Sequence, residues 1–149
     1  MHHQLIHHGQ GARTWAVVLD TGDEVNACLL DFARREVLAA TSFTAIGAFQ
    51  DAVLGYFEWE RREYRRNTFD RQLEVVSLIG DIALQDGKPQ LHMHAVLGDR
   101  DGTALGGHLL EGHVRPTLEV ILTETPAHLH KEYDADAGLA LIKLDGGSS

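Results

Sequence analysis

Short apolar stretches, separated by turn-forming residues, recur along most of the chain and predict β-strands. The first is WAVVL at residues 15–19, and β-branched and aromatic residues also fill residues 37–49. Further strands are predicted at residues 52–60, 63–69, 73–84, 91–98, 108–114, 117–124 and 138–144. Turn signals such as Asp86-Gly87 and Asp101-Gly102 lie between some of them. This close spacing of short strands favours a mainly antiparallel sheet.

One clear amphipathic helix is predicted at residues 22–36. Apolar side chains recur there at helical spacing, at Val25, Cys28, Leu29 and Phe32. Thr21, with Glu24 three residues later, fits a capping box at the start of the helix. Cys28 lies on the apolar face, where burial suppresses the thiolate, so a small core residue is favoured over a nucleophile.

Length and composition indicate one globular α+β domain. The chain has 149 residues, of which 44% are hydrophobic and 23% charged, as is usual for such domains. No apolar run approaches the roughly 18 residues that a membrane-spanning helix needs, so no membrane contact is expected. We predict that the domain occupies residues 13–144, after a His-rich N-terminal extension at residues 1–12 and before a tail at residues 145–149.

Acidic residues outnumber basic ones, and the net charge is −9 with neutral histidines. Such a charge argues against nucleic-acid binding over the whole surface. The only basic cluster comprises Arg61, Arg62, Arg65 and Arg66, and glutamates interleave with it, which favours a solvated or oligomer-facing surface. The start of the chain has no signal-peptide pattern and there is only one cysteine, so a cytoplasmic location is expected.

The segment that carries candidate chemistry is residues 80–124. Side chains alternate between the two faces of a strand, so His92 and His94 share one face. Two imidazoles at this spacing can ligate one metal ion, or they can be two polar residues on the exposed face of a half-buried strand. The best candidate for a third ligand is His108, because the two glycines before it let the backbone turn sharply or approach closely.

The metal most suited to three imidazoles is zinc, although nickel, copper and iron also accept them. Three protein ligands leave one coordination position open, as in catalytic zinc sites. Glu119, on the last of the strands in this segment, is a candidate to orient a ligating histidine or to act as a general base. The alternative for Glu119 is an exposed carboxylate or an interface salt bridge, and Glu74 is a second carboxylate of this kind.

Three further histidines are interpreted as lying outside the site. His113 follows the Gly-Gly-His segment without belonging to it, and His128 and His130 form a second H-x-H pair just after Pro126. A surface loop is the favoured interpretation of that pair.

Several short motifs together resemble a known family. They are Gly80-Asp81-Ile82, Gly87-Lys88-Pro89, Leu91-His92-Met93-His94, Asp101-Gly102, Gly106-Gly107-His108-Leu109 and Glu119-Val120. With the predicted helix before them and the last strand after them, they resemble the PPC domain, the plants and prokaryotes conserved domain, over residues 13–144. The resemblance implies a homotrimer, a mainly antiparallel sheet with flanking helices, and zinc ligation by His92, His94 and His108.

Three functions follow as hypotheses. The first is a trimeric cytoplasmic domain that binds a divalent metal through the three histidines and has a small anionic ligand or a regulatory role. The second is a metal-dependent hydrolase or lyase that uses metal-activated water, with Glu119 as the base. The third is a DNA-associated regulatory protein; plant members of the family carry AT-hooks with an Arg-Gly-Arg-Pro core, and this chain has none, which argues against DNA as a partner.

Overall fold

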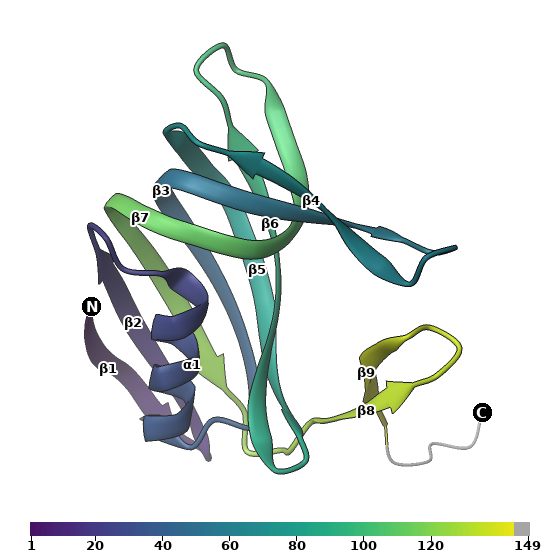
Figure 1. Ribbon diagram of the computed structural model, residues 1–149. Helices are drawn as coiled ribbons and strands as arrows, with labels where there is room; N and C mark the ends of the chain where they lie inside the picture. The colour runs from purple at the N-terminus through teal and green to yellow at the C-terminus, as the bar shows by residue number, and fades with distance from the viewer. Residues whose placement is uncertain (145–149) are drawn as a thin grey trace.

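A strongly curved, mainly antiparallel sheet forms most of the molecule, and one helix packs against one of its faces (Figure 1). The computed structural model describes residues 1–144, and the predicted tail at 145–149 lies outside the described residues. The elements are β1 His2–Gly9, β2 Ala12–Asp20, α1 Val25–Glu36, β3 Ala40–Glu58, β4 Glu63–Phe69, β5 Leu73–Gln85, β6 Lys88–Gly98, β7 Ala104–Glu124, β8 His130–Asp134 and β9 Leu139–Lys143. The predicted single domain is confirmed. The prediction of several flanking helices is only partly confirmed, because the described residues contain one helix.

The sheet is built around the pairing of β3 with both β5 and β7. Strand β2 continues the sheet beyond β7, β4 pairs with β3, and β6 pairs with both β5 and the first part of β7. Strands β8 and β9 form a hairpin, here called the C-terminal hairpin, which meets β5 through a parallel pairing of Leu84 with His130. Among the named strands of the described residues, this pairing is the only parallel one.

The helix begins three residues later than the sequence predicts. Glu24 is its N-cap residue, and the Glu24 carboxylate accepts a hydrogen bond from the backbone N–H of Ala27 at 2.7 Å. Thr21 instead donates to the carbonyl oxygen of Pro116, so the predicted capping box is wrong. A carboxylate at this position suits the first turn, because it accepts from a free N–H at the positive end of the helix dipole.

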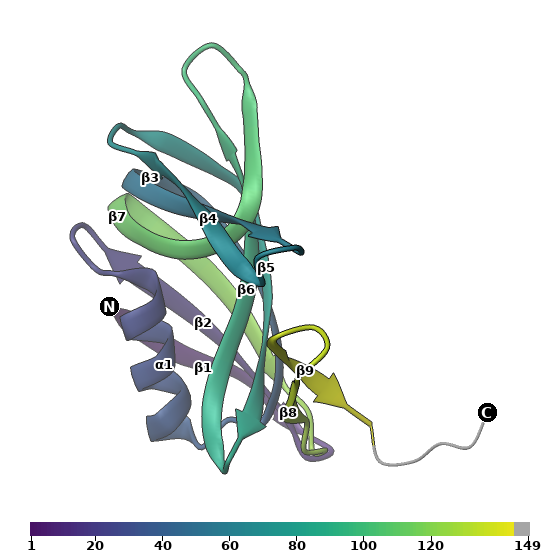
Figure 2. The same ribbon diagram turned by 45° about the vertical axis from the view of Figure 1, so that its right-hand side comes forward.

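The hydrophobic core lies between α1 and the concave face of the sheet (Figure 2). Leu29 and Phe32 of the helix are fully buried, and the Phe32 ring meets the Trp15 ring edge to face at 5.8 Å. Cys28 is partly buried against this core, and burial raises the pKa of its thiol, in keeping with a packing role. No helix of the described residues is long and apolar enough to span a membrane.

Two strands are much longer than their predicted pieces. Residues 37–49 and 52–60 lie mainly in one strand, β3, and residues 108–114 and 117–124 lie in β7. Gly47 and Pro116 lie within these two bent strands, whose pairing registers shift nearby. The bend in β7 lets its first part pair with β6 and its last part with β2.

The N-terminal residues also differ from the sequence prediction. Residues 2–9, expected to lie outside the domain, form the edge strand β1 and pair with β2. The ring of His3 lies 5.0 Å from the ring of Phe32, and the Met1 ammonium lies 2.7 Å from the Asp20 carboxylate. The His-rich segment therefore covers the edge of β2.

Candidate metal centre

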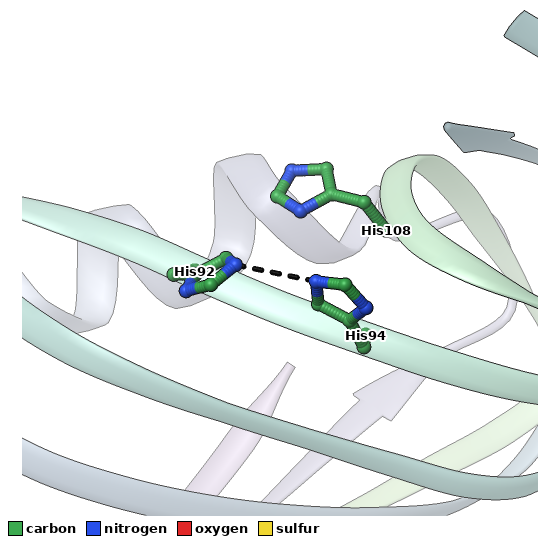
Figure 3. Close-up of side chains that lie close together, drawn as sticks. All are labelled: His92, His94 and His108. Atoms are coloured by element: carbon green, nitrogen blue, oxygen red, sulfur yellow. Dashed lines mark hydrogen bonds between the residues drawn. The ribbon is translucent and has the colours of Figure 1, made fainter. Parts of the chain in front are cut away.

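Three imidazoles meet where β6 pairs with the first part of β7 (Figure 3). His92 and His94 come from β6, and His108 on β7 is the direct pairing partner of His94. The Nε2 atoms of His92 and His94 are 3.2 Å apart, and one nitrogen from each of the three rings lies within 4.8 Å of the others. The structure thus brings together the three predicted ligands, which we call the histidine triad.

Strand alternation and two close backbone approaches position the triad. Met93 between the two β6 histidines is buried in the core, so the strand presents both histidines on its other face. A side chain at Gly107 would lie 2.8 Å from the carbonyl oxygen of Gly55, and one at Gly80 would lie 2.4 Å from the Phe43 ring. The glycine before His108 therefore serves close packing between strands and not a sharp turn.

The spacing of His92 and His94 fits two ligands of a tetrahedral metal ion. Zinc–nitrogen bonds of about 2.0–2.1 Å at tetrahedral angles separate two ligand nitrogens by about 3.3 Å, close to the 3.2 Å between His92 and His94. The His108 ring lies over the other two with one nitrogen turned toward them (Figure 3). The Nδ1 atom of His108 is buried and has no hydrogen-bond partner, as expected of an atom that is available to coordinate a ligand.

The surroundings of His94 and His108 favour the neutral form of these two imidazoles. Burial lowers the pKa of His108 to about 4, and the neighbouring His92 and His94 contribute to the same shift. Burial, followed by the charge of His92, also lowers the pKa of His94. Metal ions bind the neutral ring, so no proton has to be displaced from these two residues near pH 7.

Two charged residues next to the triad were missed by the sequence analysis. Asp81 on β5 lies opposite His92, with 3.5 Å between Oδ2 and His92 Nδ1, and the Lys131 ammonium lies 2.6 Å from Asp81 Oδ1. Burial opposes the Asp81 charge, but His92 and Lys131 outweigh it and leave the pKa of Asp81 below its ordinary value. The Tyr64 ring stacks on His108 with 4.8 Å between centroids.

Glu119 lies elsewhere on the sheet. It is exposed on the last part of β7 and pairs with Val18 and Ile46. Two strands, β3 and β5, separate it from β6, which amounts to three strand spacings or roughly 14 Å. Within one chain, Glu119 and the triad therefore do not form one site. Glu74 is likewise exposed and pairs with Gly98, at the far end of β6 from His92.

The remaining histidine candidates also lie outside the triad. His128 and His130 are exposed, with His130 at the start of β8. His113 on β7 forms a hydrogen bond with Asp51, with 2.7 Å between Nδ1 and Oδ1, and this bond raises the pKa of His113. His113 is thus paired with Asp51 on the neighbouring strand β3.

The His113–Asp51 pair predicts a pH-dependent stability. A raised pKa means that the pair stabilises the fold below the unfolded-state pKa of about 6.5 and that this contribution is lost as pH rises through the folded-state pKa. We expect His113→Gln to lower the free energy of unfolding at pH 5.5 by up to about 1 kcal/mol, because the pair is partly exposed, and to have little effect at pH 9. Urea unfolding at both pH values measures this, and an equal loss at both would contradict it.

Comparisons with known proteins identify similar sequences and folds. A model of the Plants and Prokaryotes Conserved (PCC) domain matches residues 6–126. A plant- and prokaryote-conserved protein from Pyrococcus horikoshii is 31% identical, with a TM-score of 0.84 over 90% of this chain and 93% of that chain. A metal-containing protein from Archaeoglobus fulgidus is 31% identical, with a TM-score of 0.81 over 88% and 93%. A candidate DNA-binding protein from Ralstonia eutropha is 30% identical, with a TM-score of 0.82 over 88% and 91%.

A comparison with the curated proteins finds no match.

Proposed function

Because the chain belongs to the Plants and Prokaryotes Conserved domain family, we propose that it is a cytoplasmic, trimeric domain that binds one divalent metal ion per chain through His92, His94 and His108. The observation that carries the proposal is the triad itself, three imidazoles on paired strands with ligand atoms within 4.8 Å of one another. The Archaeoglobus fulgidus relative is described as a metal-containing protein, and this description supports the proposal.

Zinc is the proposed ion, since the donor set is three imidazoles and the spacing of His92 and His94 suits two ligands of a tetrahedron. The three histidines would hold the ion on one side, and the other side would face a ligand. A divalent ion held there would supply Lewis acidity and a positive charge. Elemental mass spectrometry of the purified chain tests the proposal, with about one zinc per chain as the expected content.

Asp81 is expected to strengthen metal binding through His92. Its carboxylate faces His92 Nδ1, so it favours the tautomer with a proton on Nδ1 and a free Nε2 for the ion. We expect Asp81→Asn to weaken zinc binding by about 10–100-fold without changing the stoichiometry, as measured by competition with a chromogenic chelator. Asp86→Asn, in the exposed β5–β6 turn, is the matched control. Equal zinc affinities of the two variants, with melting curves showing both folded, would contradict the prediction.

The trimer is supported by an exposed apolar face. Apolar side chains from β3, β5, β6 and β7 lie on the sheet face that turns away from α1. We call this surface the open sheet face. Its residues are Ile46, Val76, Ile79, Val96 and Ile121. Ile46 is 61% exposed and Ile79 is 57% exposed. Contiguous apolar surface of this kind marks a site of protein association, and a second copy of the chain is the proposed occupant.

An enzymatic function is the second candidate, because a pocket borders the triad. The reaction class would be hydrolysis or a lyase step, with the bound ion as Lewis acid. Glu119 can act as the base only if a neighbouring copy contributes it, since in one chain two strands separate it from β6. Glu119→Gln would then abolish turnover without changing zinc content.

DNA association is the third candidate, and it rests on the description of the Ralstonia eutropha relative. The charges of the present chain argue against it. Arg61 pairs with Glu58, and Arg66 pairs with Glu111, so carboxylates neutralise two of the four arginines in the basic cluster. Salt-sensitive retardation of duplex DNA would support this function, and no retardation at low salt would remove it.

A further inference from the structure

A pocket of about 400 Å³ lies between the histidine triad and the C-terminal hairpin. His92 and His108 line one side, and hairpin residues 139–142 line another. We call it the hairpin pocket. Its position means that a molecule bound in it would contact two members of the triad directly.

The C-terminal hairpin is attached to the domain at several points. The backbone N–H of Leu84 donates to the carbonyl oxygen of Leu129 at 2.8 Å, where β5 meets the start of the hairpin. The Arg62 guanidinium donates to the carbonyl oxygen of Ala135 at 2.9 Å, linking the β3–β4 turn to the hairpin loop. Figure 1 shows this loop below the β3–β4 turn. The hairpin therefore forms a fixed wall of the pocket.

Lys131 is the cationic side chain among the residues that line the hairpin pocket. It is only 6% exposed, and lysine is rarely buried to this extent unless it is paired. Its partner is Asp81, whose other carboxylate oxygen faces His92. The ammonium is thus fixed beside the triad.

The lining of the pocket indicates the chemistry of its ligand. Leu139, Leu141 and Ile142 supply an apolar wall, and Gln85 and Gln90 supply uncharged amides. Lys131 and Asp81 cancel in charge, so a divalent ion on the triad would leave the site with a net positive charge. A single lysine with no arginine beside it suits a monoanion better than a phosphate, which is usually held by several donors.

We propose that the hairpin pocket binds a small carboxylic acid with an apolar body. Its carboxylate lies between Lys131 and the open position of the triad, and its apolar body packs on residues 139–142. This inference rests on the proposed metal site. The hairpin lies beyond residues 6–126, the segment matched by the family model, so the ligand is selected by a part of the chain outside that segment.

The test uses butanoate as the probe and the zinc-loaded full chain. Butanoate is titrated while the backbone amide signals of residues 139–142 are followed by NMR, and butan-1-ol serves as the uncharged analogue of equal length. We expect butanoate to shift these signals with saturation and butan-1-ol to bind at least tenfold more weakly. Equal responses to the two probes, or no shift at 139–142, would overturn the proposal.

Two substitutions identify the groups responsible. Lys131→Met removes the charge and is expected to weaken butanoate binding at least tenfold. Because this change leaves Asp81 without its partner and can unfold the chain, Leu141→Asp places a negative charge on the exposed apolar wall instead, with the same expected loss. Tyr133→Asp, on an exposed hairpin side chain that does not line the pocket, is the matched control and should bind like the original chain.

Zinc content measured on the same samples separates the two proposals. Full zinc content without butanoate binding would overturn the carboxylate pocket and leave the metal site intact. Absence of zinc would overturn the metal site. Butanoate would then be titrated into the zinc-free chain, where shifts lost in Leu141→Asp would support the pocket and no shifts would overturn it.

Discussion

Replacing His92 and His94 together by alanine is expected to remove the metal ion from the chain. The double variant keeps only His108 of the triad, and one imidazole on a strand holds zinc far more weakly than three. Loss of a residue that merely supports a ligand already costs 10–100-fold in affinity, so the loss of two ligands should exceed about 100-fold. Elemental mass spectrometry should show about one zinc per chain before substitution and almost none after it.

The metal binding of the N-terminal histidines has to be removed in this experiment, because a His-rich segment binds metals adventitiously. Deleting residues 1–10 would remove β1 and expose the edge of β2. Substitution by glutamine in every sample avoids this, at positions His2, His3, His7 and His8.

The matched control is the other H-x-H pair. His128→Ala with His130→Ala removes two exposed imidazoles outside the triad, so this variant should keep its zinc. Zinc that persists in the His92/His94 variant, or that disappears equally from the control, would contradict the assignment of the triad.

The members of the triad could be predicted from the sequence because their placement depends on local rules. The alternation of a strand places His92 and His94 on one face whatever the strand pairs with. The pairing of His108 with His94 depends on a short connection between β6 and β7. A histidine that follows two glycines near that connection is a strong candidate from sequence alone.

Asp81 and Lys131 could not be predicted in the same way. Asp81 faces His92 because of the register between β5 and β6, and a bulge between Val75 and Ser77 shifts that register. Lys131 lies in a hairpin whose strand pairing with β5 is a single parallel one, between residues 46 positions apart, 84 and 130. Interactions at such separation leave no periodic signal near either residue.

Gly47 and Pro116 show a different limit of the sequence analysis. Both residue types usually mark turns, and the predicted strands 37–49, 108–114 and 117–124 end or begin close to them. In the structure, Pro116 lies just before the part of β7 that pairs with β2, and a register shift in the β3–β7 pairing lies close by. A change of strand partner and a turn therefore look alike in the sequence.

Placing charges on the open sheet face is expected to dissociate the proposed trimer. Ile79 and Ile121 are 57% and 48% exposed in the single chain, and an isoleucine buried in an interface contributes about 1.5–3 kcal/mol. Ile79→Asp with Ile121→Asp removes both contributions and would bury carboxylates without partners, which costs more. Each 1.4 kcal/mol is tenfold in affinity, so the association should weaken by at least about 100-fold.

Sedimentation equilibrium distinguishes the two states clearly. The chain of 16.4 kDa should sediment as a species of about 49 kDa, three times that mass, and the double variant as the single chain. Val37→Asp is the control, because Val37 is 77% exposed just after α1 and lies outside the open sheet face. A double variant that remains trimeric would place the interface elsewhere. If it becomes monomeric and still binds zinc, each triad is complete within one chain.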